Sequence, residues 1–196
     1  MKTGIIILAA GSSSRLGRSK QLLDYKGKTL LQNVINEALE TNCQSVIVVL
    51  GANAEEIASQ HQNDQVNLVI NESWENGIAS SIVAGLLTMV KNNSEIESII
   101  IAVADQVFIK MNNFNNLIEK QKETGKNIIA STYAERIGTP VLFKKDYFEA
   151  LLSLTGEEGA KKILKQYSQD VETVVFEHGE IDIDTETDYN NLISQQ

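Results

Sequence analysis

The chain has 196 residues, of which 42% are hydrophobic and 22% charged, an ordinary composition for a folded globular protein. Its net charge of −9 argues against a general nucleic-acid binder, and no stretch approaches the roughly 20 apolar residues of a membrane span. The single cysteine, Cys43, excludes an internal disulfide and a multi-cysteine zinc site. The apolar run Ile5–Ala10 is too short for a secretory leader. We therefore expect a cytoplasmic protein with a reduced cysteine.

Basic residues gather at the start of the chain. Residues 1–28 hold six Lys or Arg residues and one Asp, a net charge of +5 in a protein whose total is −9. Such an island indicates a local anion site rather than an extended basic surface. A solvated basic loop would have the same composition, so charge alone leaves both interpretations open.

The first half of the chain alternates buried strands with helices. Apolar runs of strand length and helical repeats follow one another, and Thr29 with Gln32 has the capping-box form. The predicted strands are Thr3–Leu8, Ser45–Leu50, Val66–Ile70 and Ser98–Val103, and the predicted helices are Thr29–Thr41, Ala54–Gln60 and Gly77–Val90. This order predicts a three-layer α/β sandwich with a mostly parallel sheet. Ligands of such sheets lie at the carboxyl ends of the strands, so the residues after Leu8 and after Val103 should face one crevice.

The second half is less regular. The predicted helices are Asn112–Thr124, Asp146–Leu152, Gly159–Gln166 and Thr185–Ile193, with Thr185 and Asp188 as a capping box. The predicted extended segments are Asn127–Ser131, Thr139–Phe143, Val171–Phe176 and the short Ile181–Ile183. No internal repeat or linker interrupts the chain, so we expect one domain over residues 1–196.

The loop after the first strand is the most informative stretch. Residues 8–20 read Leu-Ala-Ala-Gly-Ser-Ser-Ser-Arg-Leu-Gly-Arg-Ser-Lys. Small residues let the backbone N–H groups approach an anion, and Arg15 and Lys20 add full charges for phosphate oxygens. The spacing matches neither a Walker A loop nor a dinucleotide-binding fingerprint. A flexible surface loop would need no cations, so the placement of Arg15, Gly17 and Lys20 favours phosphate binding.

Residues 8–23 resemble the nucleotide-binding signature of the molybdenum cofactor cytidylyltransferase family, a branch of the Rossmann-like nucleotidyltransferases that also activate sugars and polyols. Five further blocks follow in the order of that family. They are Asn71-x-x-Trp74-x-x-Gly77-x-x-Ser80-Ser81, Ala104-Asp105-Gln106, Gly138–Phe143, Gly156–Lys161 and Asp182–Thr185. Six blocks in order over nearly the whole chain are far more specific than any one of them. The resemblance implies a Rossmann-like nucleotidyltransferase fold and a Mg²⁺-dependent enzyme that releases pyrophosphate.

Two departures from the family pattern bear on the acceptor. Val107 stands where the family usually has proline after Asp-Gln, and it could alter the turn that presents Asp105. Glu157 stands where the family has aspartate, which keeps the charge but lengthens the reach by one methylene group.

The resemblance assigns roles around the nucleotide. Lys20 should stabilise the α-phosphate and Arg15 the outgoing β- and γ-phosphates, and with Asp105 they form the expected catalytic set. The implied nucleotide-binding residues are Leu8, Ala9, Ala10, Gly11, Ser12, Arg15, Lys20, Asn71, Gly77, Ser80, Ser81 and Asp105. Ser80 and Ser81 are equally suited to capping the helix that begins there. Leu-Ala-Ala-Gly resembles the cytidylyltransferase form of the loop, whereas the related guanylyltransferases tend to carry Leu-Ala-Gly-Gly, so CTP is favoured.

Mg²⁺ is the expected cofactor, held by one or two carboxylates together with phosphates and water. Asp105, just past a buried strand, is the expected principal ligand. Asp184 is the expected second ligand and Asp182 the alternative. Each aspartate could also act only structurally, Asp105 as a turn cap and Asp184 beside a helix N-terminus.

The acceptor side is implied by the remaining blocks. The expected substrate-binding residues are Trp74, Gln106, Thr139, Pro140, Gly156 and Glu157, although Trp74 could simply be packed. The leading hypothesis couples CTP to molybdopterin, the organic part of the molybdenum cofactor. One alternative is a sugar or polyol phosphate as acceptor, and the other is a non-catalytic chaperone that binds nucleotide or cofactor. We expect a monomer with no nucleic-acid or membrane partner and at most transient contact with a molybdoenzyme or its chaperone. His61 and His178 lie in polar sequence and receive no role.

Overall fold

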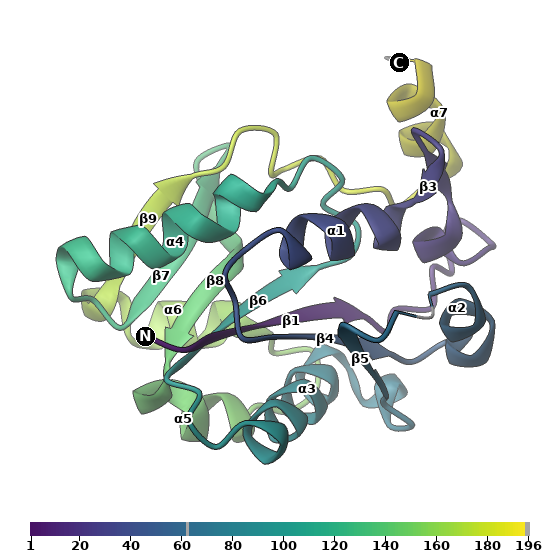
Figure 1. Ribbon diagram of the computed structural model, residues 1–196. Coiled ribbons are helices and arrows are strands. Elements are labelled where there is room, and N and C mark those ends of the chain that lie inside the picture. Colours follow the sequence, from purple (N-terminus) through teal and green to yellow (C-terminus); the bar gives the residue numbers. More distant parts are fainter. Residues whose placement is uncertain (62, 195–196) are drawn as a thin grey trace.

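The computed structural model describes residues 1–61 and 63–194, and its central feature is a seven-stranded sheet (Figure 1). The strands lie in the order β5-β4-β1-β6-β8-β7-β9. Their bounds are β1 (Thr3–Ala9), β4 (Ser45–Leu50), β5 (Val66–Ile70), β6 (Ser98–Val103), β7 (Ile128–Tyr133), β8 (Arg136–Lys144) and β9 (Val171–Val175). β8 runs antiparallel to β6 and β7, and the other neighbouring strands are parallel. The predicted mostly parallel, Rossmann-like α/β fold is confirmed.

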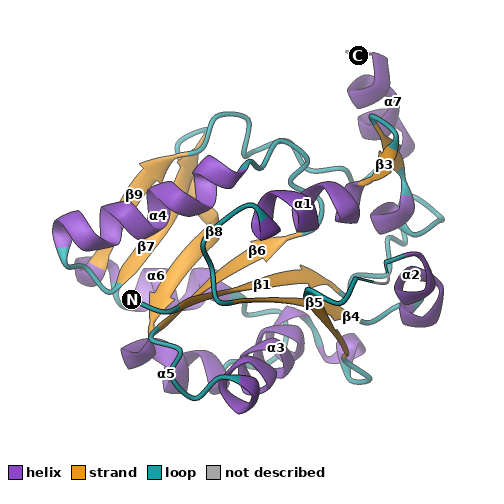
Figure 2. Cartoon of the chain, viewed as in Figure 1, coloured by secondary structure: helices purple, strands orange, loops and turns teal. Residues whose placement is uncertain are grey.

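Helices cover both faces of this sheet (Figure 2). One face carries α1 (Leu30–Leu39), α2 (Ala54–Gln60) and α4 (Met111–Thr124), and the other carries α3 (Ile78–Asn92), α5 (Phe148–Leu152) and α6 (Ala160–Gln166). Successive side chains of a strand point to opposite faces, so Ile5 and Ile7 pack into one core and Ile6 and Leu8 into the other. The fully buried apolar runs predicted from the sequence therefore serve two cores at once.

A third, smaller cluster joins the end of the chain to its beginning. α7 (Glu186–Ser194) lies beside the hairpin of β2 (Asp24–Tyr25) and β3 (Lys28–Thr29), as Figure 1 shows. Ile183 and Leu192 are buried there against Leu16 and Leu23. The C-terminal segment is thus packed against the loop that the sequence identifies as the phosphate-binding candidate.

Several predicted bounds are reproduced and others change. β4, β5, β6 and α2 have the predicted bounds. Between the predicted strand Thr3–Leu8 and the predicted helix Thr29–Thr41, where no element was predicted, the chain forms a 3₁₀ helix at Lys20–Leu22 and the β2–β3 hairpin. The strand predicted at Thr139–Phe143 is the inner part of the longer β8. The helix predicted at Asp146–Leu152 is divided into the 3₁₀ helix Lys145–Tyr147 and α5.

The two predicted capping boxes differ in completeness. At α7 both halves are present, because the Thr185 N–H donates to Asp188 and the Asp188 N–H donates to Thr185. At α1 the Gln32 N–H donates to Thr29 Oγ1 at 3.0 Å, but the Gln32 side chain contacts Asn36 instead of returning to the cap.

His61 is buried although the sequence around it is polar. Its side chain is only 3% exposed at the end of α2, and its ring nitrogens lie 3.3 Å from Thr29 Oγ1 and Gln32 Oε1. Burial lowers the pKa of His61 below its ordinary value. The residue therefore links α2 to the start of α1 as a neutral imidazole.

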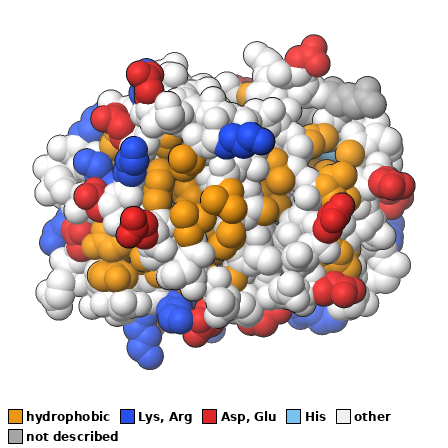
Figure 3. All heavy atoms as spheres, turned by 90° about the horizontal axis from the view of Figure 1, so that it is seen from below, with side chains coloured by type: hydrophobic (Ala, Val, Ile, Leu, Met, Phe, Trp, Pro, Cys, Tyr) orange, Lys and Arg blue, Asp and Glu red, His pale blue; other side chains and the backbone are white. Residues whose placement is uncertain are grey.

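The face formed by α3 and α5 exposes apolar side chains in the space-filling view from below (Figure 3). Leu87 and Val90 of α3 and Leu152 of α5 are among the exposed large hydrophobic residues. Leu87 and Val90 belong to the C-terminal half of α3, away from the carboxyl ends of the strands. None of the helices in the described ranges has the length and hydropathy that a membrane span requires.

Candidate active site

The loop that follows β1 is held by buried hydrogen bonds. Gln21, only 2% exposed, donates from Nε2 to the carbonyl oxygens of Ala9 at 2.7 Å and Gly11 at 3.1 Å. The Lys20 N–H donates to Ser13 Oγ at 3.1 Å, with Ser13 in the left-handed region at φ 53°. The two ends of the loop are therefore tied together, and Gln21, which had no predicted role, is the residue that anchors its base.

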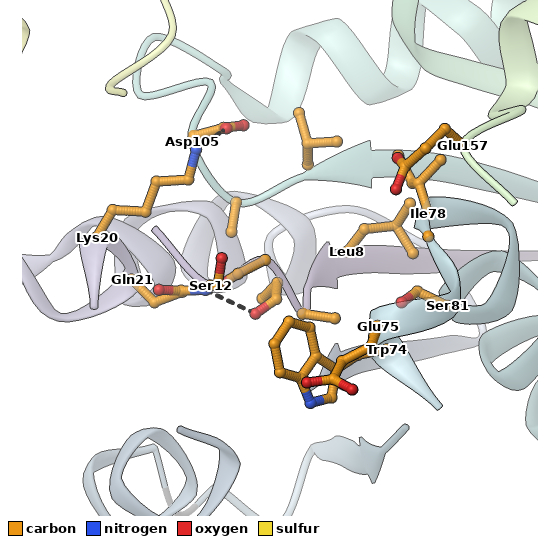
Figure 4. Close-up of a pocket in the computed structure, with 16 residues that line it drawn as sticks. Leu8, Ser12, Lys20, Gln21, Trp74, Glu75, Ile78, Ser81, Asp105 and Glu157 are labelled. Carbon is orange, nitrogen blue, oxygen red and sulfur yellow. Dashed lines mark hydrogen bonds and ion pairs between the residues drawn. The ribbon is translucent and has the colours of Figure 1, made fainter. Parts of the chain in front are cut away.

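A cavity of about 340 Å³, which we call the loop pocket, lies between this loop and the N-terminus of α3 (Figure 4). In Figure 4 Lys20 and Asp105 meet on one side of this pocket, and Glu157 and Ile78 lie on another. Its lining consists of Leu8, Ala9, Ala10, Gly11, Ser12, Lys20, Gln21, Trp74, Glu75, Gly77, Ile78, Ser81, Val103, Ala104, Asp105 and Glu157. Segments that lie nearly 100 residues apart thus meet at the carboxyl ends of β1 and β6, as the topology predicts.

Lys20 lies between two carboxylates at this edge of the sheet. Its Nζ donates to Asp105 Oδ2 at 2.5 Å and to Asp184 Oδ1 at 2.9 Å. Burial lowers the pKa of Lys20, but the charges and hydrogen bonds of the two aspartates outweigh this, so its pKa lies above the ordinary value. The hydrogen bond from Lys20 holds the pKa of Asp184 below its usual range. Lys20 is therefore a charged ammonium group that an incoming phosphate would have to share with these carboxylates.

Arg15 and Arg18 contact the C-terminal segment. Arg15 donates to Asp184 Oδ2 at 2.8 Å, and Arg18 forms two hydrogen bonds to Glu186 at 2.8 and 3.0 Å. The Arg15 side chain is 70% exposed and does not line the loop pocket. Exposed pairs of this kind contribute little to stability, so a ligand with greater charge could displace the Arg15 contact at low cost.

A second cavity, which we call the α6 pocket, adjoins the first and measures about 790 Å³. The two pockets share Ile78, Val103, Asp105 and Glu157. The other lining residues are Gln106, Tyr133, Gly138, Thr139, Val141, Glu158, Gly159, Ala160, Lys161, Lys162, Leu164, Lys165 and Asp182. Asp105 therefore stands at the junction of two sites, each large enough for a small organic ligand.

A close backbone contact joins the walls of the two pockets. Gly77 has φ 92° and ψ 175°, a conformation that is essentially restricted to glycine. A Cβ atom at this position would lie 2.5 Å from the carbonyl carbon of Gly156. The Gly156 carbonyl also accepts a hydrogen bond from the Ala79 N–H at 3.1 Å. Gly77 thus lets the segment that carries Glu157 dock on the N-terminus of α3.

Gln106 is fixed at the wall of the α6 pocket. It is 1% exposed, and its Nε2 donates to the carbonyl oxygens of Thr139 at 3.0 Å and Gly179 at 2.9 Å. Among the described residues its Oε1 has no hydrogen-bond partner. The side chain is therefore held in one orientation at the end of β6.

The family follows from this fold and site. The model of the MobA-like NTP transferase domain matches residues 5–171, which include the loop, Asp105 and α6. The chain belongs to this family. It is thus a nucleotidyltransferase, and the resemblance recognised in the sequence is confirmed at this level.

The similarity of this MobA-like domain to individual proteins differs in identity and in the share of each chain that is covered. Nicotine blue oxidoreductase of Paenarthrobacter nicotinovorans is 29% identical, over 82% of this chain and 80% of that protein. The molybdenum cofactor cytidylyltransferase of Escherichia coli (strain K12) is 32% identical over 82 residues, or 41% of this chain and 42% of that one. A Mycobacterium tuberculosis H37Rv protein solved in complex with manganese superposes with a TM-score of 0.81 over 100% of both chains, and its 22% identity makes this a likeness of fold.

Most of the residues that are predicted to bind nucleotide lie together in this MobA-like domain. Those that line the loop pocket are Leu8, Ala9, Ala10, Gly11, Ser12, Lys20, Gly77, Ser81 and Asp105. Arg15, Asn71 and Ser80 lie outside this lining. Asn71 is buried and donates to Ser80 Oγ at 2.8 Å and Ser81 Oγ at 3.0 Å, while Ser80 donates to the Gly77 carbonyl oxygen. These hydrogen bonds fasten the loop before α3, so Asn71 and Ser80 shape the pocket rather than face it.

The predicted acceptor residues are divided between the two pockets. Gln106 and Thr139 line the α6 pocket, Glu157 lines both, and Trp74 lines the loop pocket instead. Pro140 and Gly156 line neither. Residues without a predicted role also contribute, notably Gln21, Glu75 and Ile78 in the loop pocket and Tyr133, Lys162 and Lys165 in the α6 pocket. No local sequence pattern assigns these positions to the site, because they come from separate elements that only tertiary packing brings together.

Proposed function

We propose that this nucleotidyltransferase transfers CMP from CTP to molybdopterin, the organic part of the molybdenum cofactor, with Mg²⁺ and with release of pyrophosphate. The observation that carries the proposal is the position of Asp105. It lies at the junction of the loop pocket and the α6 pocket, 2.5 Å from Lys20 Nζ. An acceptor in one pocket and a triphosphate in the other would meet at this carboxylate.

In the proposed reaction a phosphate oxygen of the acceptor attacks the α-phosphorus of CTP. A new oxygen–phosphorus bond forms while the bond to the bridging oxygen breaks, and pyrophosphate leaves with the electron pair. The protein positions the two reactants and neutralises charge on the phosphate oxygens. Lys20 is assigned to the α-phosphate and Arg15 to the leaving phosphates, since each ammonium or guanidinium group can exchange its aspartate partner for phosphate.

The residues at the junction fit a divalent cation. Asp105 and Asp184 both contact Lys20 Nζ, so the position between them suits positive charge. Burial, and then the negative charges of Asp105 and Asp184, raise the pKa of the nearby Asp182 to about 6. Two carboxylates would leave the other positions around Mg²⁺ to phosphate oxygens and water, which is the usual arrangement for this ion. When bound, Mg²⁺ would neutralise negative charge on the two anionic reactants and so reduce the repulsion between them.

Two features support CTP and a large acceptor. Ala10 lines the loop pocket, and its methyl group takes up space that the second glycine of a Leu-Ala-Gly-Gly loop would leave open. This smaller space favours a pyrimidine base over a purine base. The α6 pocket, at about 790 Å³, has room for a fused-ring acceptor. A relative named molybdenum cofactor cytidylyltransferase adds support. We further propose that the protein acts as a cytoplasmic monomer.

A second candidate comes from the relative named nicotine blue oxidoreductase. A nicotinamide or flavin dinucleotide carries a pyrophosphate that the loop pocket could hold in place of a triphosphate. In that case the α6 pocket would take an organic redox substrate.

The deciding experiment measures pyrophosphate release with Mg²⁺ for CTP, GTP, ATP and UTP against the molybdenum cofactor and a panel of sugar and polyol phosphates. Release with CTP and molybdenum cofactor alone is the expected result. Release with a sugar or polyol phosphate would keep the reaction and change the acceptor, and preference for GTP would overturn the choice of nucleotide. Nucleotide binding without release from any pair would favour a carrier, and oxidation of NADH or NADPH by a quinone-like dye would favour the second candidate.

A further inference from the structure

Three lysines of α6 line the α6 pocket, at the side away from the phosphate-binding loop. Lys161 and Lys165 are four residues apart, so they lie on one face of the helix, and Leu164 lies with them in the lining. Ile163 and Leu164 are buried in the core, whereas Lys161 and Lys165 are exposed. The packing of α6 therefore places Lys161 and Lys165 at the solvent-facing rim of the cavity.

The three lysines differ in whether a carboxylate pairs with them. Lys162 donates to Glu158 Oε2 at 2.6 Å. Within residues 1–61 and 63–194 no carboxylate forms an ion pair with Lys161 or Lys165. Like charges one helical turn apart repel each other, so this pair is mildly unfavourable without an anion. The same cavity is also lined by the carboxylates of Asp105, Glu157, Glu158 and Asp182, so its lining carries both signs of charge.

The lining of the cavity thus combines both signs of charge with apolar surface, which Ile78, Val103, Val141 and Leu164 supply. A ligand that fills it would place one group at Asp105, where the proposed transfer occurs, and a different group at Lys161 and Lys165. A ring system between these two groups of the ligand would cover the apolar walls.

We propose that Lys161 and Lys165 form an anion subsite that binds a second anionic group of the acceptor, remote from its nucleophilic phosphate. This inference rests on the proposed function, and it narrows the acceptor to an organic molecule with two separated anionic groups. It disfavours a simple polyol phosphate, whose single charged group is the nucleophile and whose other end is neutral. The lysines are positioning and specificity residues, because they lie away from the reacting atoms.

The first test measures binding without turnover, by fluorescence titration of pterin-6-carboxylate and of the neutral 6-methylpterin in the absence of nucleotide. Removal of one exposed charge contact typically weakens binding by up to about fivefold, so with two lysines we expect the carboxylate to bind about tenfold more tightly than the neutral pterin. K161Q and K165Q should each reduce this preference, and the double variant should abolish it. K165R should preserve it, and high salt should weaken it.

The matched control is K91Q, because Lys91 is exposed near the end of α3 and lines neither pocket. It should leave both pterin affinities unchanged. A carboxylate preference that survives in the double variant would overturn the proposal. So would the absence of a preference in the wild-type protein, including the case in which neither pterin binds.

The second test separates this inference from the proposed function. In the pyrophosphate-release assay the double variant should raise KM for the acceptor about tenfold while KM for CTP and kcat stay within about twofold. Lysine-dependent carboxylate binding without turnover for any acceptor would support the subsite and refute the proposed function. Turnover with the molybdenum cofactor and an unchanged acceptor KM in the double variant would support the proposed function and refute the subsite.

Discussion

The loop pocket and the α6 pocket are built in different ways. Most of the loop pocket comes from residues 8–21 and 103–105, two short stretches at the ends of adjacent parallel strands. The α6 pocket takes its lining from six separate stretches from Ile78 to Asp182, including the antiparallel strand β8. A site made of one continuous loop leaves a pattern in the sequence. A site made of single residues from many elements becomes visible only when those elements are packed together.

The junction between the pockets has features of both. Asp105 follows β6 directly, so topology alone places it at the carboxyl edge of the sheet. Its neighbour Asp184 arrives from the C-terminal segment, which is held by Ile183 and Leu192 against the residues around the loop. Two carboxylates nearly 80 positions apart therefore share Lys20 as a partner.

The largest expected effect concerns the loop pocket. Lys20→Ala removes a charge that is already positioned beside the junction, and loss of one such group typically lowers the rate by about 10²–10³-fold. We expect this loss in kcat for pyrophosphate release, with the far-ultraviolet circular dichroism spectrum unchanged. The control is Lys28→Ala, which should retain activity. Lys28 is an exposed lysine of the β2–β3 hairpin and lines neither pocket. More than a tenth of wild-type turnover in Lys20→Ala would contradict the role assigned to Lys20.

The next effect tests whether the two pockets depend on one backbone contact. In Gly77→Ala the new Cβ would meet the Gly156 carbonyl, and the backbone would have to keep a conformation that only glycine adopts readily. Strain and overpacking together should lower the free energy of unfolding by about 2–4 kcal/mol, measured by urea denaturation. Because Gly156 is followed by Glu157, which lines both pockets, affinity for both substrates should also fall.

Gly125→Ala is the matched control for this strain. Gly125 also has a positive φ, 69°, at the end of α4, but a Cβ there would meet nothing within 4 Å. The substitution should therefore cost about 1 kcal/mol from the left-handed backbone alone and leave activity unchanged. Equal losses of stability in the two variants would mean that the contact between Gly77 and Gly156 contributes nothing beyond local backbone strain.

The difference between local sequence patterns and contacts of distant segments also explains which parts of the structure the sequence could predict. β4 and β6 are buried on both faces, so they are continuous apolar runs whose bounds are clear in the sequence. The 3₁₀ helix and the short hairpin within residues 9–28 are stabilised by the C-terminal segment that packs on them, and no local pattern indicates that contact. Gln21 and His61 were missed for the same reason. Each is a polar residue in a polar stretch whose burial depends on tertiary packing.

The smallest expected effect concerns His61 and the pH dependence of stability. Burial lowers the pKa of His61 in the folded protein, so the unfolded chain binds a proton more readily. The stability associated with the neutral imidazole is present above the unfolded pKa of about 6.5 and is lost as the pH falls through the folded value. Thermal unfolding at pH 8 and at pH 5.5 should show a smaller decrease in Tm for His61→Gln than for the wild-type protein. His178→Asn changes the other, exposed histidine and should keep the wild-type slope. An unchanged slope in His61→Gln would mean that another group sets the acid sensitivity between these pH values, whatever the difference in Tm at pH 8.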